Sequence, residues 1–273
     1  MTSNEPNEQR TTPRETALVT GAGTGIGAAI AERLAARGTN LVVVGRDHAR
    51  LESAARRLRA EQGIEVLAVP LDLSVRDAPA RLAGRLGDSG LEVDLLVNNA
   101  GAALVGPVAG ADPGATRALV DLNAGALAEL TALFLPAMVA RGRGAVVNIA
   151  STAAYAPTPH NAVYGASKAF VLSFTRALWE ETRGTGVRVV AVSPGAVETP
   201  MNRRSLPGKR QPEQTADTVM AALRGRAPAV VDGRTFAVQA FVFGRLLPAR
   251  TAGRITAKFF GGASRASRER KRS

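Results

Sequence analysis

The chain of 273 residues contains no cysteine, which excludes a disulfide scaffold, a cysteine nucleophile and a thiolate metal site. Its only histidines are His48 and His160, so the sequence predicts neither a structural zinc site nor a multi-histidine metal centre. The sequence contains no run of about 18 apolar residues, so it predicts no membrane span. Residues 1–14 are polar and partly acidic, unlike a signal peptide, so we expect a disordered N-terminal arm on a cytoplasmic protein.

The composition is otherwise that of an ordinary globular protein, with 45% hydrophobic and 21% charged residues. The net charge of +12 is concentrated at one end of the chain. Residues 201–273 contain 16 lysines and arginines against 4 acidic residues, whereas residues 1–200 contain 19 of each sign. Because the basic excess belongs to the C-terminal quarter alone, the sequence predicts no nucleic-acid partner.

Short apolar runs rich in β-branched residues alternate with stretches of helical length. The runs are Ala17–Val19, Leu41–Val44, Val66–Val69, Leu95–Val97, Ala145–Ile149 and Val187–Val192. The helical stretches include Ile26–Arg37, Ala49–Gln62, Thr116–Arg141 and Tyr164–Arg183, each closely followed by a glycine. Uniformly apolar strands are buried on both faces, which is typical of parallel sheets. The sequence therefore predicts an α/β fold, a Rossmann-type doubly wound parallel sheet forming a single domain over residues 15–235.

A glycine-rich segment, Gly21–Gly27, follows the first apolar run and opens the first helical stretch. Glycines at such a turn let the backbone approach a pyrophosphate, which binds the free N–H groups at the start of the helix. A glycine-rich turn alone is weak evidence, but its position favours a nucleotide site. Its spacing, Gly21-x-x-x-Gly25-x-Gly27, differs from the common G-x-G-x-x-G.

Further segments follow this turn in order, each near the end of an apolar run. They are Asn98-Asn99-Ala100-Gly101, Ser151, Tyr164-Gly165-Ala166-Ser167-Lys168, and Pro194-Gly195 with Thr199. Ser151 lies 13 residues before Tyr164. Over roughly Ala17 to Pro200 the chain thus resembles the short-chain dehydrogenase/reductase family, with its TGxxxGIG, NNAG, Ser, YxASK and PGxxxT motifs.

The residue types themselves indicate the chemistry. Tyr164 and Lys168 are four residues apart, so on a helix their side chains share one face. A tyrosine titrates at about 10, and a nearby ammonium lowers that pKa, so Tyr164 can act as general acid and base. The resemblance implies that Lys168 also binds ribose hydroxyls, that Ser151 bonds the substrate oxygen, and that Asn123 holds a water linking Lys168 to solvent. Taken singly, these residues would be an exposed pair, a cap and a helix-bending polar residue.

The residues at the end of the second apolar run indicate whether NAD or NADP is preferred. In the family an acidic residue there selects NAD, whereas this chain has Gly45 followed by Arg46, which can accommodate a 2′-phosphate. We expect NADP(H) to be preferred and NAD to remain possible. Asp72 is expected to bind the adenine amine or to cap the next helix. The implied cofactor site comprises Gly21, Thr24, Gly25, Ile26, Gly27, Arg46, Asp72, Leu73, Asn99, Ala100, Gly101, Tyr164, Lys168, Pro194, Gly195, Val197 and Thr199.

Beyond residue 200 the chain follows the family at first and departs from it in a longer C-terminal ending. Residues 201–215 take the place of its substrate loop, Glu213–Arg224 reads as a helix and Ala229–Val231 as an edge strand. Residues 236–262 form an apolar and basic extension that we expect to be helical, and residues 263–273 a basic disordered tail. We also expect Tyr155 to lie in a loop or in the wall of the substrate pocket.

The extension contains five of the eight phenylalanines, and Arg250, Arg254 and Lys258 recur along it every four residues, opposite Ile255 and Phe259. Such a basic amphipathic helix can cover the subunit's own pocket, form a subunit interface or contact a membrane surface. These alternatives stay open at this point.

The sequence therefore predicts an NADP(H)-dependent oxidoreductase that reduces a carbonyl or oxidises a secondary alcohol, with an apolar small-molecule substrate. One alternative is a ketoreductase of lipids or acyl chains, acting at a membrane surface or on a carrier protein. Another is a catalytically silent NADP-sensing protein, which the intact proton donor disfavours. The resemblance also implies a homodimer or homotetramer formed through helices 116–141 and 164–183.

Overall fold

The computed structural model describes residues 14–202 and 208–258. The expected N-terminal arm up to residue 13 lies outside the described residues. So do residues 203–207 of the expected substrate loop, Phe259 and Phe260, and the expected tail over 263–273.

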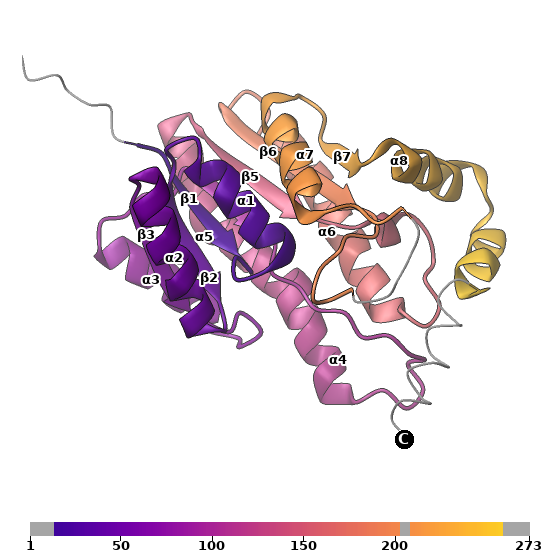
Figure 1. Ribbon diagram of the computed structural model, residues 1–273. Helices are drawn as coiled ribbons and strands as arrows, with labels where there is room; N and C mark the ends of the chain where they lie inside the picture. The colour runs from indigo at the N-terminus through magenta and orange to yellow at the C-terminus, as the bar shows by residue number, and fades with distance from the viewer. Residues whose placement is uncertain (1–13, 203–207, 259–273) are drawn as a thin grey trace, which may run out of the picture.

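Seven parallel strands form one sheet in the order β3-β2-β1-β4-β5-β6-β7 (Figure 1). They are β1 (Thr16–Thr20), β2 (Asn40–Gly45), β3 (Val66–Pro70), β4 (Leu95–Asn98), β5 (Gly144–Ile149), β6 (Val187–Pro194) and β7 (Ala229–Asp232). The predicted edge strand is β7, which pairs with β6. The strand order reverses between β1 and β4, and this is where an open parallel sheet binds its ligand.

Helices cover both faces of the sheet (Figure 1). On one face lie α1 (Gly25–Ala35), α2 (His48–Gln62) and α7 (Pro212–Arg224). On the other lie α3 (Ala78–Asp88), α4 (Pro113–Val120), η1 (Asp121–Ala126), α5 (Leu127–Arg141) and α6 (Ala162–Glu181). The predicted Rossmann-type doubly wound sheet is confirmed, and Gly63 and Gly142 end α2 and α5 in the left-handed conformation.

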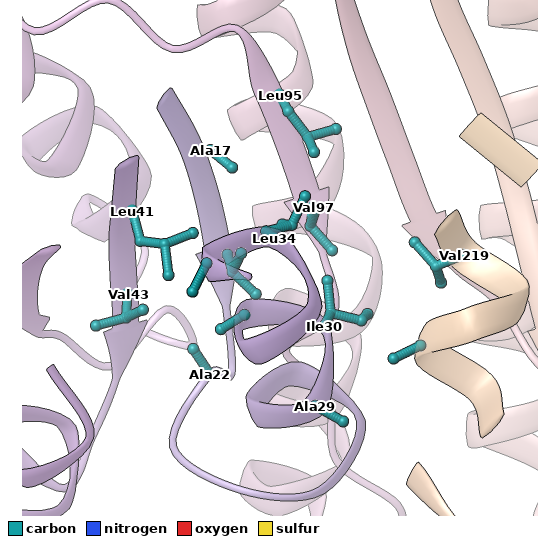
Figure 2. Packing of buried hydrophobic residues seen from close by; sticks show 14 of the residues in the cluster. Ala17, Ala22, Ala29, Ile30, Leu34, Leu41, Val43, Leu95, Val97 and Val219 are labelled. Carbon is teal, nitrogen blue, oxygen red and sulfur yellow. The ribbon is translucent and has the colours of Figure 1, made fainter. Parts of the chain in front are cut away.

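The first core layer fills the space between the sheet and the helices α1, α2 and α7. Figure 2 shows Ile30 and Leu34 of α1 directed toward Val97 and neighbouring strand residues, with Val219 of α7 beside them. Ile30 is fully buried, and burying such a side chain stabilises the fold by roughly 1.5–3 kcal/mol. The sheet is therefore held rigid beneath its carboxyl edge, where the side chains for chemistry gather.

The predicted helix over 116–141 is one continuous helical run, but it begins earlier, at Pro113, and contains the π turn η1. Among the described residues, this run is the one helix that is long and apolar enough to cross a membrane. A single helix of this kind is weak evidence for a membrane span. Leu130 and Met138 are buried against the sheet, and Asp121 and Glu129 interrupt the apolar sequence. One side of the run thus packs against the sheet, whereas Val120, Leu133 and Val139 are exposed.

The C-terminal extension is helical, with α8 (Arg234–Phe241), the π turn η3 (Val242–Leu246) and a helix over 249–258. It rests on the segment between β5 and α6. The Thr256 hydroxyl donates to the Pro157 carbonyl at 2.6 Å, Gly244 lies against Tyr155, and Ala252 is fully buried. The extension thus covers part of its own subunit.

Candidate active site

One cavity of about 1580 Å³ runs along the carboxyl ends of the strands. Every predicted site residue lines it except Gly27 and Asn123. The end that carries Arg46 and Asp72 lies beyond β2 and β3, and the end that carries Ser151 and Tyr164 follows β5. The cavity is larger than most small-ligand pockets and has room for a dinucleotide together with a substrate.

The glycine turn is shaped by close backbone contacts. Gly21 has φ +66°, and a Cβ on Gly27 would lie 2.3 Å from the Gly21 carbonyl oxygen, so neither position accepts a side chain. The Asn99 side-chain amide donates to the Thr20 carbonyl at 2.9 Å, and the Thr20 hydroxyl accepts from the Asn99 and Ala100 backbone N–H groups. Asn99 therefore positions the turn, and Gly27 serves the site through packing.

The residues present fit a dinucleotide phosphate. Helix α1 begins at Gly25 beside the cavity, and its first turn contains no acidic residue, so its free N–H groups and positive dipole end suit a pyrophosphate. Arg46 is exposed at the cavity. Asp47 also lines the cavity, and one of its carboxylate oxygens caps α2 by accepting from the Arg50 N–H at 3.0 Å.

Asp72 does not cap the next helix, because the N-cap of α3 is Asp77. One of its carboxylate oxygens accepts from the N–H and the hydroxyl of Ser74, at 2.9 and 2.7 Å. Burial raises the pKa of Asp72, but the Ser74 hydrogen bonds and the nearby Arg46 charge outweigh it and hold the pKa below the ordinary value. Asp72 is thus ionised at neutral pH and lines the end of the cavity beyond β2 and β3.

Ser151, Tyr164 and Lys168 converge on the other end of the cavity. Ser151 begins the short 3-10 helix η2 (Thr152–Tyr155), and its hydroxyl accepts from the Ala153 N–H at 3.2 Å. The Lys168 ammonium donates to the Ile149 carbonyl at 2.7 Å and lies 5.9 Å from the centre of the Tyr164 ring. Helix α6 therefore presents the predicted pair on one face, with the serine opposite.

Burial dominates the titration of this group. It raises the pKa of Tyr164, and a hydrogen bond with Ser151 offsets only part of that rise. Burial also lowers the pKa of Lys168 to about 8. The pKa-lowering effect expected from Lys168 does not govern Tyr164 in this structure, where the shift follows from burial and the Ser151 hydrogen bond. The phenol is therefore protonated at neutral pH.

Asn123 lies in the π turn η1, and π turns within α-helices are frequent at functional sites. Its side-chain oxygen accepts from the Ala102 N–H at 2.8 Å, and its amide donates to the Ala102 carbonyl and to the Ser167 hydroxyl. The side chain thus fastens the loop after β4 to α6. The water-holding role expected for Asn123 stays a prediction.

The sequence analysis missed Asn161, three residues before Tyr164. It is buried, lines the cavity and makes no side-chain cap for α6, and its side-chain oxygen has no partner among the residues that the structure describes. A polar residue before a helix ordinarily indicates a cap, which hid this position. Conversely, Tyr155 does not line the cavity, because its hydroxyl lies 3.4 Å from the Ser193 hydroxyl and its ring packs in the core.

The extension supplies an apolar part of the cavity wall. Phe236, Ala240, Phe243 and Ile255 line it. The ring of Phe236 lies so close to Gly195 that a Cβ there would be 2.4 Å from the ring. The phenylalanine count drew attention to this segment, but the sequence alone did not show which ring reaches the site.

A buried ladder of amides and hydroxyls joins the central strands below the site. The Asn98 amide donates to the Thr131 hydroxyl at 3.1 Å and to the Asn148 side-chain oxygen at 2.9 Å. The Asn148 amide donates in turn to the Thr175 hydroxyl at 2.9 Å. The ladder connects β4 and β5 to the helix α5 and to α6, which contains Tyr164 and Lys168.

Comparison with known proteins agrees with this arrangement. The sequence pattern of the short chain dehydrogenase family matches residues 15–210. An uncharacterised oxidoreductase of Staphylococcus saprophyticus is 36% identical over 208 residues, which is 76% of this chain and 88% of the relative. An NADP-dependent 3-hydroxy acid dehydrogenase of Salmonella typhimurium is 40% identical over 181 residues, or 66% of this chain and 71% of the relative. The chain belongs to the short chain dehydrogenase family and is an oxidoreductase, as the motifs indicated.

Solved structures show the same fold. A short-chain dehydrogenase from Sphingobium yanoikuyae in complex with NADPH has a TM-score of 0.77 and 36% identity, covering 82% of this chain and 90% of the other. A bulky-bulky ketone specific alcohol dehydrogenase from Comamonas testosteroni has a TM-score of 0.74 and 34% identity, covering 81% and 86%.

Proposed function

We propose that this oxidoreductase uses NADP(H) and reduces an apolar ketone, or oxidises the corresponding secondary alcohol. The observation that carries the proposal is the convergence of Ser151, Tyr164 and Lys168 in a cavity that also contains a glycine turn and Arg46. A similar solved enzyme holds NADPH, and a relative is named for its use of NADP. A protein that only sensed the nucleotide would not need the proton donor.

In reduction, bound NADPH supplies the hydride that adds to the carbonyl carbon. The Tyr164 hydroxyl donates its proton to the carbonyl oxygen as negative charge develops there, and the phenolate then regains a proton from solvent. The Ser151 hydroxyl donates a hydrogen bond to the same oxygen, which orients the carbonyl and stabilises its charge. Oxidation runs through these steps in reverse, with the phenolate accepting the alcohol proton.

Lys168 has three N–H donors, and the Ile149 carbonyl occupies one of them. The other two N–H groups are left for a ribose hydroxyl and for the side chain of Tyr164. While charged, the ammonium favours the phenolate that forms during reduction. Asn123 is a positioning residue, because its hydrogen bonds hold the loop at Ala102 against Ser167 of the helix that carries Tyr164.

The substrate class follows from the wall of the cavity. Its catalytic end is lined by apolar side chains that include Ala153, Phe236 and Phe243, with polar Thr152, Thr158, Asn161 and Gln239 among them. Such a wall favours apolar substrates through burial of their surface. A solved neighbour is named for its specificity toward bulky ketones, which supports the same class here.

The test is oxidation of NADPH, followed by its absorbance, against ketones that differ in bulk and charge. We expect bulky apolar ketones to give a kcat/KM well above that of small or anionic ones. Turnover with none of the ketones, together with tight NADPH binding, would contradict an enzymatic role and favour nucleotide sensing.

Cofactor selectivity is expected to depend on Arg46. Replacement by aspartate removes a partner of the 2′-phosphate and adds a repelling charge, so NADPH affinity should fall at least tenfold while NADH affinity changes little, since a hydrogen bond to a charged group is worth about 1.5–3 kcal/mol. Fluorescence titration of both cofactors measures this. Arg56→Asp, at an exposed arginine on α2 outside the cavity, is the matched control. Equal weakening of both cofactors by Arg46→Asp would remove Arg46 from the phosphate site.

The pH dependence should differ between the two directions. Because burial holds the pKa of Tyr164 above its ordinary value, the protonated form needed for reduction persists through neutral pH and is lost only as the pH rises through that pKa. The phenolate needed for oxidation grows over the same rise. We therefore expect kcat/KM for reduction to stay level at neutral pH, and that for oxidation to increase into the alkaline range. An oxidation rate that does not increase would mean that another group accepts the proton.

A further inference from the structure

The described part of the C-terminal extension has two different faces. Its inner face includes Phe236, Ala240 and Phe243, which line the catalytic cavity. Its outer face is formed by other residues of α8, η3 and the helix over 249–258, which lie at one end of the molecule beyond β7 (Figure 1). We call the exposed basic and large apolar residues of this segment that lie outside the cavity lining the C-terminal surface; they are Arg234, Val238, Phe241, Arg245, Leu246, Arg250, Arg254 and Lys258.

Three large apolar side chains project from this surface. Val238, Leu246 and Phe241 are 63%, 62% and 58% exposed, the highest fractions among the large hydrophobic side chains of the described residues. Val238 and Phe241 are three residues apart on α8, so they share one side of that helix. Large apolar side chains exposed in this way indicate a surface that contacts a partner or a membrane.

The charge of the surface has one sign. Arg234, Arg245, Arg250, Arg254 and Lys258 are all exposed, and none of them belongs to an ion pair within residues 14–202 and 208–258. The sequence contains no aspartate or glutamate from Gly233 to Arg268. The neighbouring Asp232 is fully buried and bound to Arg210, Thr215 and Thr218. The basic groups therefore have no acidic partner on this surface.

We propose that the C-terminal surface binds the face of an anionic lipid bilayer. Apolar side chains that protrude among arginines and lysine match the interface of a bilayer, where the former enter the boundary of the acyl chains and the latter meet the headgroups. A nucleic acid would leave the exposed Val238, Phe241 and Leu246 in water, so charge alone does not explain the surface. The proposal does not depend on the substrate, because these residues lie outside the cavity lining.

The test is co-sedimentation of the full-length protein with vesicles of phosphatidylcholine alone, or of phosphatidylcholine with about a third of phosphatidylglycerol, at low and high salt. We expect binding to the anionic vesicles only, weakened by salt. Each basic residue near such a surface contributes about fivefold to the affinity, so Arg245→Gln, Arg250→Gln and Arg254→Gln together should weaken binding on the order of a hundredfold. Val238→Ser with Phe241→Ser should weaken it at both salt concentrations.

The control carries Arg37→Gln, Arg56→Gln and Arg85→Gln, which remove the same charge from exposed arginines elsewhere that form no described ion pair. It should bind vesicles within a fewfold of the unmodified protein, and melting curves and NADPH affinity establish that all variants fold. Equal loss in the control would mean that net charge, not this surface, attracts the protein. Absence of vesicle binding, with a smaller particle size in Val238→Ser/Phe241→Ser, would overturn the proposal in favour of a subunit interface. Binding of a soluble acidic protein in place of vesicles would overturn it as well.

Discussion

Tyr164→Phe should lower kcat by about 10²–10⁴-fold while the affinity for NADPH stays nearly unchanged. The substitution removes only the hydroxyl that donates the proton and leaves the ring beside Lys168 in place. Steady-state reduction of a bulky ketone and a separate NADPH titration measure the two quantities.

Tyr155→Phe is the matched control, because its hydroxyl faces Ser193 away from the cavity. This variant should keep the kcat of the unmodified protein. If Tyr164→Phe instead retained more than about a tenth of kcat, which corresponds to a barrier change of about 1.4 kcal/mol, the proton donor would have to be another group.

Removal of residues 236–273 should reduce both stability and substrate affinity. The deletion takes away the Phe236 ring that packs on Gly195, the buried Ala240 and Ala252, and the bond from Thr256 to Pro157. Because burial of a phenylalanine alone contributes roughly 1.5–3 kcal/mol, we expect the free energy of unfolding to fall by several kcal/mol. The KM for apolar ketones should rise, since part of the cavity wall is lost.

Denaturant unfolding and ketone kinetics measure these effects, and removal of residues 264–273 alone is the control. The shorter deletion leaves every described contact intact and should change neither quantity. A protein without residues 236–273 that kept its stability and its KM would show that the extension contributes nothing to the domain.

The sheet could be predicted in detail because each strand is predominantly apolar, with only isolated polar residues such as Asn148 and Arg188. All six predicted runs are strands, extended at their ends by at most two residues, as for Val187–Val192 within β6. Helix α3 was not singled out, since Gly84 and Gly87 weaken its helical pattern. The π turn could not be predicted either, and the contacts that Asn123 makes from it, with Ala102 and Ser167, join segments far apart in the sequence.

The candidate site was predictable where spacing along one helix or one turn defines it. Tyr164 and Lys168 share a helix face, and the glycines share a turn, so the sequence places them near one another. Contacts between distant segments were not predictable. The approach of Phe236 to Gly195 joins positions 41 residues apart, and nothing local to either residue indicates it. The assignment of roles to these residues stays a prediction until the variants are measured.

The amide ladder beneath the site has a consequence for how the chain reaches this fold. A shift of β4 against β5 by one residue would turn Asn98 and Asn148 to opposite faces, because side chains alternate along a strand. The Asn98 amide would then lose its acceptors on Thr131 and Asn148, and the Asn148 side-chain oxygen would lose its donor, at a cost of about 1–3 kcal/mol for each buried group left without a partner. Neighbouring strands made of Leu, Val and Ile tolerate such slips more readily, since their side chains are nearly interchangeable. The ladder therefore favours the native register of β4 against β5 during folding. It disfavours misaligned sheets that would bury as much apolar surface as the native one.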